Sequence, residues 1–367
     1  MNINIENDEI ISYFKKLFDR YDFKFYLVGG AIRDKILTLE PVDYDFVVEA
    51  EEDDYFYIVE SLSKELNFDF KYHKHYRTAI LQYKDKRIDL AMSRREFYPV
   101  PASKPIVFPT NIYQDLKRRD FTINSLAYDL KGKILIDPFN GLEDIKEKRI
   151  RVLHDLSFRD DPSRIFRGIK YASRFNFNFD KRTFDLIKLA LSTGYVNLLP
   201  GNRLRNEIIA ALKEKNIKYT LSILQELKLF NTLIGEDFTL NMNFDVEEFN
   251  TLKDEEKFIV LFYKNDEETI LKSMEILNLS NNFKLNCELL KQVNKLIGDN
   301  VKELYRYLII NINKINKKVL YCLFSKYESI ANYIRNIDRI KYDFKGFEKE
   351  DIVSYKIEKL LEFWGRE

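Results

Sequence analysis

Two carboxylates one residue apart give this sequence its clearest capacity for chemistry. Asp43 and Asp45 open the run Asp-Tyr-Asp-Phe-Val-Val, whose apolar second half predicts a β-strand. Residues i and i+2 of a strand point to the same face, so we expect the two carboxylates to lie side by side. They would repel each other without a cation between them, and hard oxygen ligands favour Mg²⁺. The pattern indicates a site where two metal ions assist phosphoryl or nucleotidyl transfer.

A glycine pair before this strand could bind a phosphate group. The apolar run 25–28 predicts a short strand that breaks at Gly29 and Gly30, and a helical stretch begins at Ala31. Adjacent glycines let the backbone come close to a ligand, and a helix N-terminus offers unpaired N–H groups. A Gly-Gly turn alone is commonplace, and so is Asp-x-Asp on a solvated strand edge. Their succession within one stretch favours a phosphate cradle beside a metal site.

The segment 27–34, Leu-Val-Gly-Gly-Ala-Ile-Arg-Asp, followed by Asp-Tyr-Asp at 43–45, resembles the nucleotidyltransferase head of the class II CCA-adding tRNA nucleotidyltransferase and bacterial poly(A) polymerase family. The resemblance extends over residues 20–212. It implies an α+β fold: a polymerase-beta-like head with an antiparallel or mixed five-stranded sheet and helices, then an all-helical neck, body and tail. The implied domains are a catalytic head at 1–136, a neck for base recognition at 137–210, and a body and tail for tRNA binding at 211–367.

Two arginines stand where a further helix is predicted to begin. Arg118 and Arg119 precede Asp120, a candidate N-cap, and apolar residues follow at helical spacing from Phe121. Arginine forks bind phosphate oxygens, and Asn124, one turn into the helix, could bind the same group or a sugar hydroxyl. The surrounding string resembles the second motif of the family. The resemblance implies a nucleotide-binding set that joins these residues to the glycine turn: Gly29, Gly30, Arg33, Arg118, Arg119, Asp120 and Asn124.

The segment 159–177 carries the base-recognition hypothesis. Asp161 and Arg164 are three residues apart on a predicted helix, so they share a face. Arginine supplies donors and aspartate supplies acceptors, which together can pair with cytosine and adenine and reject the edges of uracil and guanine. Arg167 and Lys170 continue this face and could reach a phosphate. The segment resembles the family's fourth motif, in which protein side chains act as the template.

Alternating patterns at 68–72, 78–83 and 88–92 predict three strands of an antiparallel meander. Asp89 lies on the last of them, which we expect to neighbour the strand of the Asp-x-Asp pair. Two interpretations of Asp89 stay open. It is either a third carboxylate that contacts the metal or the attacking hydroxyl, as in polymerases of the resembling superfamily, or a partner in a plain salt bridge at a strand end.

Four prolines crowd the next stretch and predict a loop from Arg94 to Thr110. Members of the resembling family have a mobile loop at this place that is needed for the switch from adding C to adding A, and CC-adding members lack it. A loop of fair length here favours a protein that is able to add A.

The composition restricts the class of protein. No unbroken apolar run of about 18 residues occurs, which argues against a membrane span. Because Cys287 and Cys322 are the only cysteines and only three histidines are present, we predict buried reduced thiols, no structural zinc site and a cytoplasmic protein. Residues 1–60 carry 15 acidic and 6 basic side chains, whereas the remainder carries 44 acidic and 54 basic ones. This asymmetry suits a metal site joined to a surface for polyanions.

The helical remainder after residue 210 interleaves aromatic and basic residues, as at Tyr305-Arg306-Tyr307, which could bind an RNA backbone. With the resemblance, this predicts an enzyme that adds CCA to the 3′ end of tRNA from CTP and ATP, with two Mg²⁺ ions, no membrane association and an open oligomeric state. The catalytic set is Asp43, Asp45 and Asp89, with Asp43 and Asp45 as metal ligands. The alternatives are an enzyme that adds only A or only CC, a poly(A) polymerase, and an inactive RNA-binding scaffold.

Overall fold

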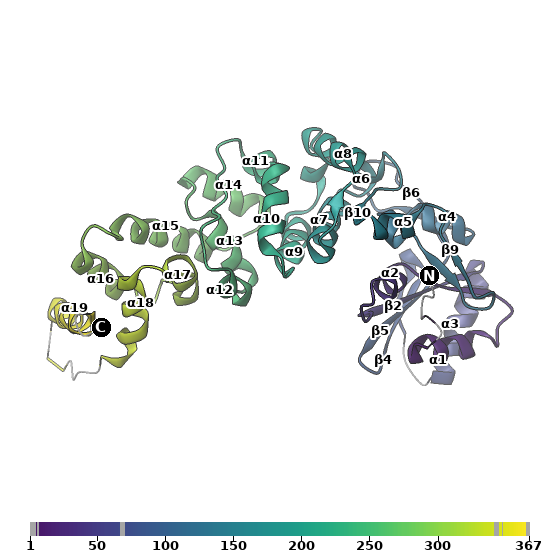
Figure 1. Cartoon of the computed structure of the whole chain (residues 1–367), viewed down its shortest axis with the longest axis horizontal. Helices are drawn as coiled ribbons and strands as arrows, with labels where there is room; N and C mark the ends of the chain where they lie inside the picture. Colours follow the sequence, from purple (N-terminus) through teal and green to yellow (C-terminus); the bar gives the residue numbers. More distant parts are fainter. Residues whose placement is uncertain (1–4, 6, 67–69, 341–344, 347, 365–367) are drawn as a thin grey trace. The chain divides into compact units, whose positions relative to one another are not determined.

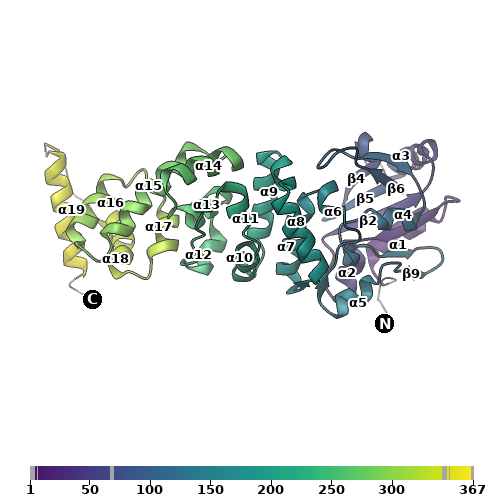
Figure 2. The same cartoon turned by 90° about the horizontal axis from the view of Figure 1, so that it is seen from above.

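The structure is a computed structural model that describes residues 5, 7–66, 70–340, 345–346 and 348–364. The chain divides into two compact units, Met1–Leu198 and Leu199–Glu367. The first unit contains the sheet, and the described residues of the second unit form helices and the connections between them. Figure 1 labels the elements along the chain, and Figure 2 shows the same elements from above.

A mixed sheet of seven strands forms the centre of the first unit within the described residues. In the order in which they pair, the strands are β3 (Lys71–His73), β4 (Thr78–Tyr83), β5 (Lys86–Met92), β2 (Asp43–Glu49), β1 (Lys24–Val28), β8 (Ala127–Asp129) and β9 (Ile134–Ile136). β2 and β5 run parallel, and the other neighbours are antiparallel. The predicted fold class is confirmed, but the predicted number of five strands is wrong.

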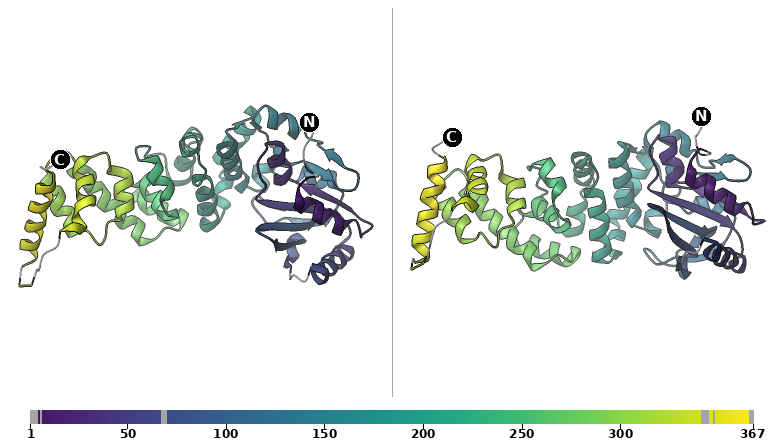
Figure 3. Two further views of the ribbon diagram at one scale, coloured as in Figure 1. Left: turned by 60° about the horizontal axis from the view of Figure 1, so that its bottom comes forward. Right: turned by 90° about the horizontal axis from the view of Figure 1, so that it is seen from below.

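The first unit also contains helices. They are α1 (Glu9–Phe18), α2 (Gly30–Ile36), α3 (Glu52–Leu66), α4 (Ile112–Lys117), α5 (Gly141–Lys146), α6 (Ser157–Asp160), α7 (Ser163–Phe175) and α8 (Lys181–Ser192), with short 3₁₀ turns at η1 (Lys74–Tyr76), η2 (Thr122–Asn124) and η3 (Tyr195–Leu198). α1 starts where the Asp8 carboxylate caps its first N–H groups. It lies against the sheet (Figure 3), where the Phe18 ring stacks on Phe25 of β1 at 4.2 Å.

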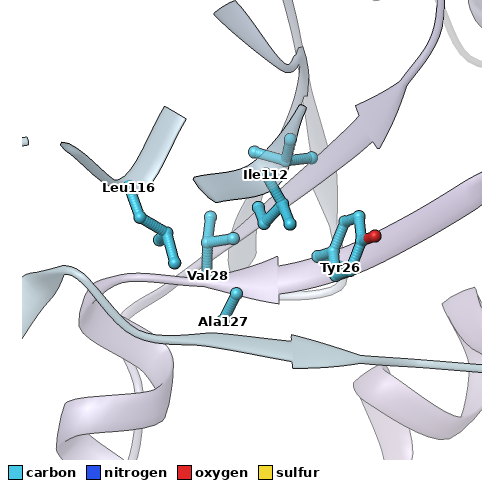
Figure 4. Packing of buried hydrophobic residues seen from close by; sticks show 6 residues of the cluster. Tyr26, Val28, Ile112, Leu116 and Ala127 are labelled. Atoms are coloured by element: carbon cyan, nitrogen blue, oxygen red, sulfur yellow. The ribbon is translucent and has the colours of Figure 1, made fainter. Parts of the chain in front are cut away.

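A cluster of buried side chains packs α4 onto β1 and β8 (Figure 4). Val28, Leu116 and Ala127 are wholly buried, and Tyr26 and Ile112 are nearly so. Burying an apolar side chain of this size stabilises the fold by about 1.5–3 kcal/mol. The packing fixes the C-terminal end of α4 beside the end of β1, which is where the predicted arginine pair and glycine pair lie.

Residues 94–110 were predicted to be a loop, but the structure shows that they are not a loop throughout. They form a hairpin of β6 (Arg94–Phe97) and β7 (Ile106–Pro109), paired antiparallel from Arg94↔Pro109 to Phe97↔Ile106. A two-stranded ribbon tolerates proline because each strand has an unpaired edge, and the other prolines of this stretch lie in the connection. The count of prolines therefore misled the prediction.

The helix predicted from Phe121 is also wrong, because only the turn η2 is helical and β8 follows it. Asp120 is not the N-cap of η2, which is Phe121 without a side-chain cap. Instead, β8 pairs with β1, so the backbone from Ala127 is satisfied by the sheet. The meander is confirmed in β3, β4 and β5, although residues 68 and 69 of its first predicted strand lie outside the described residues.

The second unit is a succession of helices. They are α9 (Gly201–Leu212), α10 (Ile217–Glu226), α11 (Leu229–Ile234), α12 (Val246–Thr251), α13 (Asp254–Phe262), α14 (Glu267–Leu277), α15 (Asn281–Leu296), α16 (Val301–Ile310), α17 (Lys317–Phe324), α18 (Glu328–Asn336), with η4 (Ile337–Arg339) after it, and α19 (Lys349–Trp364). Cys287 and Cys322 are buried and free, as predicted. Within the described part of the chain, none of the helices combines the length and apolar character that crossing a membrane requires.

Candidate active site

Gly29 brings three parts of the predicted site together. Its backbone has φ 71° and ψ −128°, a conformation that residues with a Cβ rarely adopt. A Cβ placed here would lie 2.8 Å from Nη1 of Arg119 and 3.7 Å from Oδ2 of Asp45. The glycine turn, the second arginine and the metal-ligand candidate therefore meet at one point. α2 behind the turn spans only seven residues, so this close approach, more than a helix end, is what the turn offers a phosphate.

The carboxylates occupy neighbouring strands, as predicted. Asp45 of β2 is in register with Asp89 of β5, and Asp43 lies at the exposed start of β2. Burial, together with the charges of Asp89 and Asp43, raises the pKa of Asp45 to about 6 against the opposing charge of Arg119. This edge of the site carries more negative charge than its own residues balance.

Asp89 is held by a neighbour on its own strand. Nε and Nη2 of Arg87 donate to its two carboxylate oxygens, each at 2.7 Å. Among the described residues, no group of three or more His, Cys, Asp or Glu side chains is arranged as a ready-made metal cluster. The geometry therefore shows the salt bridge that was one of the two interpretations of Asp89.

The chemistry of the donor set nevertheless fits a divalent cation. Asp43 and Asp45 supply hard carboxylate oxygens, which Mg²⁺ prefers. The raised pKa of Asp45 arises from burial and from like charges, and a bound cation relieves both. These two residues would hold the ion.

Arg118 and Arg119 are both held by Asp115, a residue that the sequence reasoning did not select. Asp115 is fully buried, and its carboxylate accepts Nη2 of Arg118 at 2.8 Å and Nη2 of Arg119 at 3.0 Å. Burial alone would raise the pKa of Asp115, but the arginine charges around it lower the pKa to about 2. The signal was present in the spacing, since Asp115 lies three and four residues before the arginines on one helical face.

Asp120 is a buried residue that holds two of the predicted site residues in place. It is 3% exposed, and its Oδ2 accepts Nε and Nη2 of Arg167 at 3.1 and 2.6 Å. Its Oδ1 accepts Nδ2 of Asn124 at 3.1 Å. Burial would raise the pKa of Asp120, yet the guanidinium of Arg167 lowers it to about 2. Asp120 and Arg167, both predicted to bind the nucleotide, bind each other and orient Asn124.

Arg33 is buried between the glycine turn and α7. It donates to Oδ1 of Asn124 and to the carboxylate of Asp34, and its guanidinium lies over the rings of Tyr171 and Phe175 at 5.1 and 4.6 Å. The residue is 4% exposed. Arg33 thus joins α2 to α7, which fixes the segment that carries the predicted base-recognition residues.

Asp161 and Arg164 were predicted to share one helical face, but they do not, because Asp161 lies outside α7. Asp161 lies in extended backbone just before α7, and its Oδ1 accepts the N–H and Oγ–H of Ser163 at 3.1 and 2.7 Å. Arg164 is 4% exposed and donates to the carbonyls of Arg118 and Arg119 at 2.8 and 3.3 Å. The structure therefore connects Arg164 directly to the arginine pair. Lys170 lies on α7 and approaches the ring of Tyr171 at 5.7 Å.

Known proteins share this sequence and fold. The model of the poly A polymerase head domain matches residues 25–151. The CCA-adding enzyme of Francisella tularensis subsp. novicida is 31% identical over 361 residues, which cover 91% of this chain and 93% of that enzyme. An A-adding tRNA nucleotidyltransferase of Geobacter sulfurreducens is 38% identical over 204 residues, which cover 54% of this chain but only 23% of that protein.

Among solved structures, the CCA-adding enzyme of Thermotoga maritima complexed with tRNA superposes with a TM-score of 0.75 at 25% identity, covering 98% of this chain and 93% of that one. The similarity to the Francisella enzyme extends over nearly the whole of both chains. The matched head domain contains the glycine turn, the carboxylates and the arginine pair. The chain therefore belongs to the class II CCA-adding tRNA nucleotidyltransferase and bacterial poly(A) polymerase family.

Proposed function

We propose that this protein adds the 3′-terminal C, C and A to tRNA, with CTP and ATP as substrates and pyrophosphate as the released product. The observation that carries the proposal is the similarity to the Francisella CCA-adding enzyme along 91% of this chain. The tRNA-bound Thermotoga enzyme supports tRNA as the partner, because its fold matches both the sheet-containing and the helical units.

In this proposal the carboxylate edge holds two Mg²⁺ ions on Asp43 and Asp45, and Asp89 lies next to them. When bound, the ions lower the pKa of the primer 3′-hydroxyl and neutralise charge on the pyrophosphate. Arg119 beside Gly29 binds triphosphate oxygens, since its Nε is buried and has no partner among the described residues. A buried unpaired donor is costly, so a ligand oxygen at this place is strongly favoured.

The remaining nucleotide contacts fall to residues that the protein itself holds in place. Gly30 keeps the turn open, and Arg118 donates to the triphosphate with the N–H groups that its carboxylate partners leave over. Arg33, Asp120 and Arg167 orient Asn124, which binds phosphate or a sugar hydroxyl. Arg118, Arg119 and Asn124 are thus assigned to contacts with the nucleotide, and Arg33, Asp120 and Arg167 to alignment.

Base choice is assigned to Asp161 and Arg164, and Lys170, further along α7, is assigned to a phosphate. The Nη atoms of Arg164 donate to backbone carbonyls and to Ser157, and its Nε–H takes no part in these bonds. That N–H can meet the ring acceptor of cytosine or adenine, and the Asp161 carboxylate can accept the exocyclic amine. We further propose a catalytic head at 1–136, a base-recognition neck at 137–210 and a tRNA-binding body and tail at 211–367.

A second candidate function is the addition of A alone to tRNA that already ends in CC. It is favoured by the A-adding relative of Geobacter, whose identity of 38% exceeds that of the Francisella enzyme over a shorter stretch. Both candidates need the base-recognition residues and the segment 94–110, so the residues of the site do not separate them.

One set of primer extensions separates them. Three tRNA substrates, ending at the discriminator base, at C and at CC, receive Mg²⁺ and CTP, ATP or both, and the products are sized to one nucleotide. Full CCA on the shortest tRNA is the expected result. A single A on the CC-ended tRNA alone would establish the second candidate, a ladder of A on any RNA would indicate a poly(A) polymerase, and no product would indicate an inactive scaffold.

A further inference from the structure

The two faces of the β6–β7 hairpin differ sharply. Arg95 and Phe97 of β6 are exposed, whereas the alternate side chains, Arg94 and Glu96, are only 11% and 7% exposed. A buried carboxylate on a ribbon that stands outside the main sheet requires a reason, because taking a charge out of water is costly unless it is paired.

Glu96 finds three donors. Its Oε1 accepts Nε of Arg94 at 3.1 Å and Nη1 of Arg118 at 3.0 Å, and its Oε2 accepts the hydroxyl of Tyr98 at 2.8 Å. The Coulombic pull of Arg118 and Arg94 keeps the pKa of Glu96 low although burial would raise it. Glu96 is therefore an ionised side chain whose strongest partner belongs to the predicted nucleotide site.

Two carboxylates hold the guanidinium of Arg118. Its Nε and Nη2 donate to Asp115 of α4 at 3.0 and 2.8 Å, and its Nη1 donates to Glu96 of the hairpin. The Nε also donates to the carbonyl of Arg94 at 3.0 Å. These bonds define the plane of the guanidinium and leave one N–H on Nη1 and one on Nη2 for a ligand.

The other end of the hairpin contacts the base-recognition segment. The N–H of Ala102 donates to the carbonyl of Arg159 in α6 at 3.0 Å. Asp161 and Arg164 also lie close enough to Tyr98 to influence the pKa of its phenol, which burial raises. The hairpin thus connects the residue that orients Arg118 with the residues assigned to base choice.

We propose that Glu96 is a positioning residue: its carboxylate orients the Arg118 guanidinium toward the nucleotide triphosphate, so that nucleotide binding depends on the hairpin. The inference rests on the proposed function in that Arg118 contacts the triphosphate. Because the triphosphate is common to both substrates, the dependence applies equally to CTP and ATP.

The test compares Glu96→Gln and Tyr98→Phe with a matched control, Glu60→Gln, which removes an ion pair with Lys64 on the exposed face of α3. The dissociation constants of CTP and ATP are measured with Mg²⁺ in the absence of tRNA. Glu96→Gln is expected to raise both by roughly tenfold, the factor that one charge-assisted hydrogen bond contributes. Tyr98→Phe is expected to raise both by roughly twofold, since it loosens Glu96 and keeps its charge. The control and the affinity for tRNA should not change.

A double-mutant cycle distinguishes positioning from a merely structural role. Once Arg118 is replaced by Lys, which cannot form the fork, Glu96→Gln should cost no further nucleotide affinity. Unchanged nucleotide affinity in both hairpin variants, whether or not their melting temperatures fall, would overturn the proposal, and so would additive effects in the cycle. Failure of the wild type to extend tRNA would overturn the proposed function instead, while the nucleotide affinities would still decide the role of Glu96.

Discussion

The two sides of the site treat buried charge in opposite ways. On the carboxylate edge, burial and like charges raise the pKa of Asp45 to about 6. On the arginine side, Asp115 and Asp120 are more deeply buried, yet arginine partners lower the pKa of each to about 2. The arginine side is balanced by the protein itself, whereas the carboxylate edge is completed only by something that binds. In the proposed function, this contrast separates the residues that would align the site from those that would bind its cations.

The largest effect is expected on the carboxylate edge. Asp43→Ala removes a metal ligand and should abolish nucleotide transfer, with a loss of at least roughly 1,000-fold, because the metal ions supply several kcal/mol of charge stabilisation. Binding of tRNA should survive. Primer extension under single-turnover conditions, together with a filter-binding measurement of tRNA affinity, checks both parts. Retained transfer would remove Asp43 from the metal site.

On the arginine side, removal of a carboxylate should lower the stability of the protein. Asp120→Asn leaves Arg167 without its carboxylate and should lower the free energy of unfolding by about 3 kcal/mol, the usual cost of breaking a buried ion pair. Asp155→Asn, which removes an exposed pair with Arg182, is the matched control and should leave the free energy of unfolding almost unchanged. Urea denaturation measures both, and equal costs would contradict the assignment of Asp120 as a buried support.

Acid should lower the stability of the protein through His154, which lines a pocket together with Arg151 and Arg182. Burial, together with the charges of Arg164 and Lys117, lowers the pKa of His154 to about 4. The unfolded chain therefore takes up the proton first as the pH falls from about 6.5 to 4, and stability should fall by about 2 kcal/mol after allowance for solvent screening. His154→Gln should remove this slope. Denaturation at pH 7.5, 6, 5 and 4 tests it, and an unchanged slope in the variant would exclude His154 as the source.

The smallest predicted effect concerns base choice. Arg164→Lys keeps a positive charge but loses the fork, so discrimination of CTP and ATP against UTP should fall by roughly tenfold, the value of about one hydrogen bond. Overall nucleotide affinity should change less. Competition between labelled nucleotides in single-addition assays measures the ratio, and unchanged discrimination would remove Arg164 from base recognition.

Local periodicity was sufficient for the parts of the fold whose neighbours in sequence decide their structure. Strand parity placed Asp43 and Asp45 on β2 and Asp89 on a neighbouring strand, and the register Asp45↔Asp89 confirms that pairing. The prediction of a helix from Phe121 was wrong because the backbone that follows pairs with β1, which lies almost a hundred residues earlier in the chain.

The candidate site was predictable in its residue types but not in its connections. The arginine pair and the glycine turn carry chemical signals of their own, whereas Asp115 and Glu96 matter through partners that folding brings to them. Nothing in the local pattern of Arg164 shows that it is buried against the carbonyls of Arg118 and Arg119. Such roles depend on desolvation, which only the packed structure sets.

The most direct measurement is the stoichiometry of Mn²⁺ binding in the presence of CTP, which electron paramagnetic resonance can determine. The contrast between the two sides predicts two bound ions in the wild type, loss of binding in Asp45→Asn, and unchanged stoichiometry in Glu96→Gln, whose carboxylate is already balanced by arginines. Two ions retained by Asp45→Asn would contradict the assignment of the metal ions to the carboxylate edge.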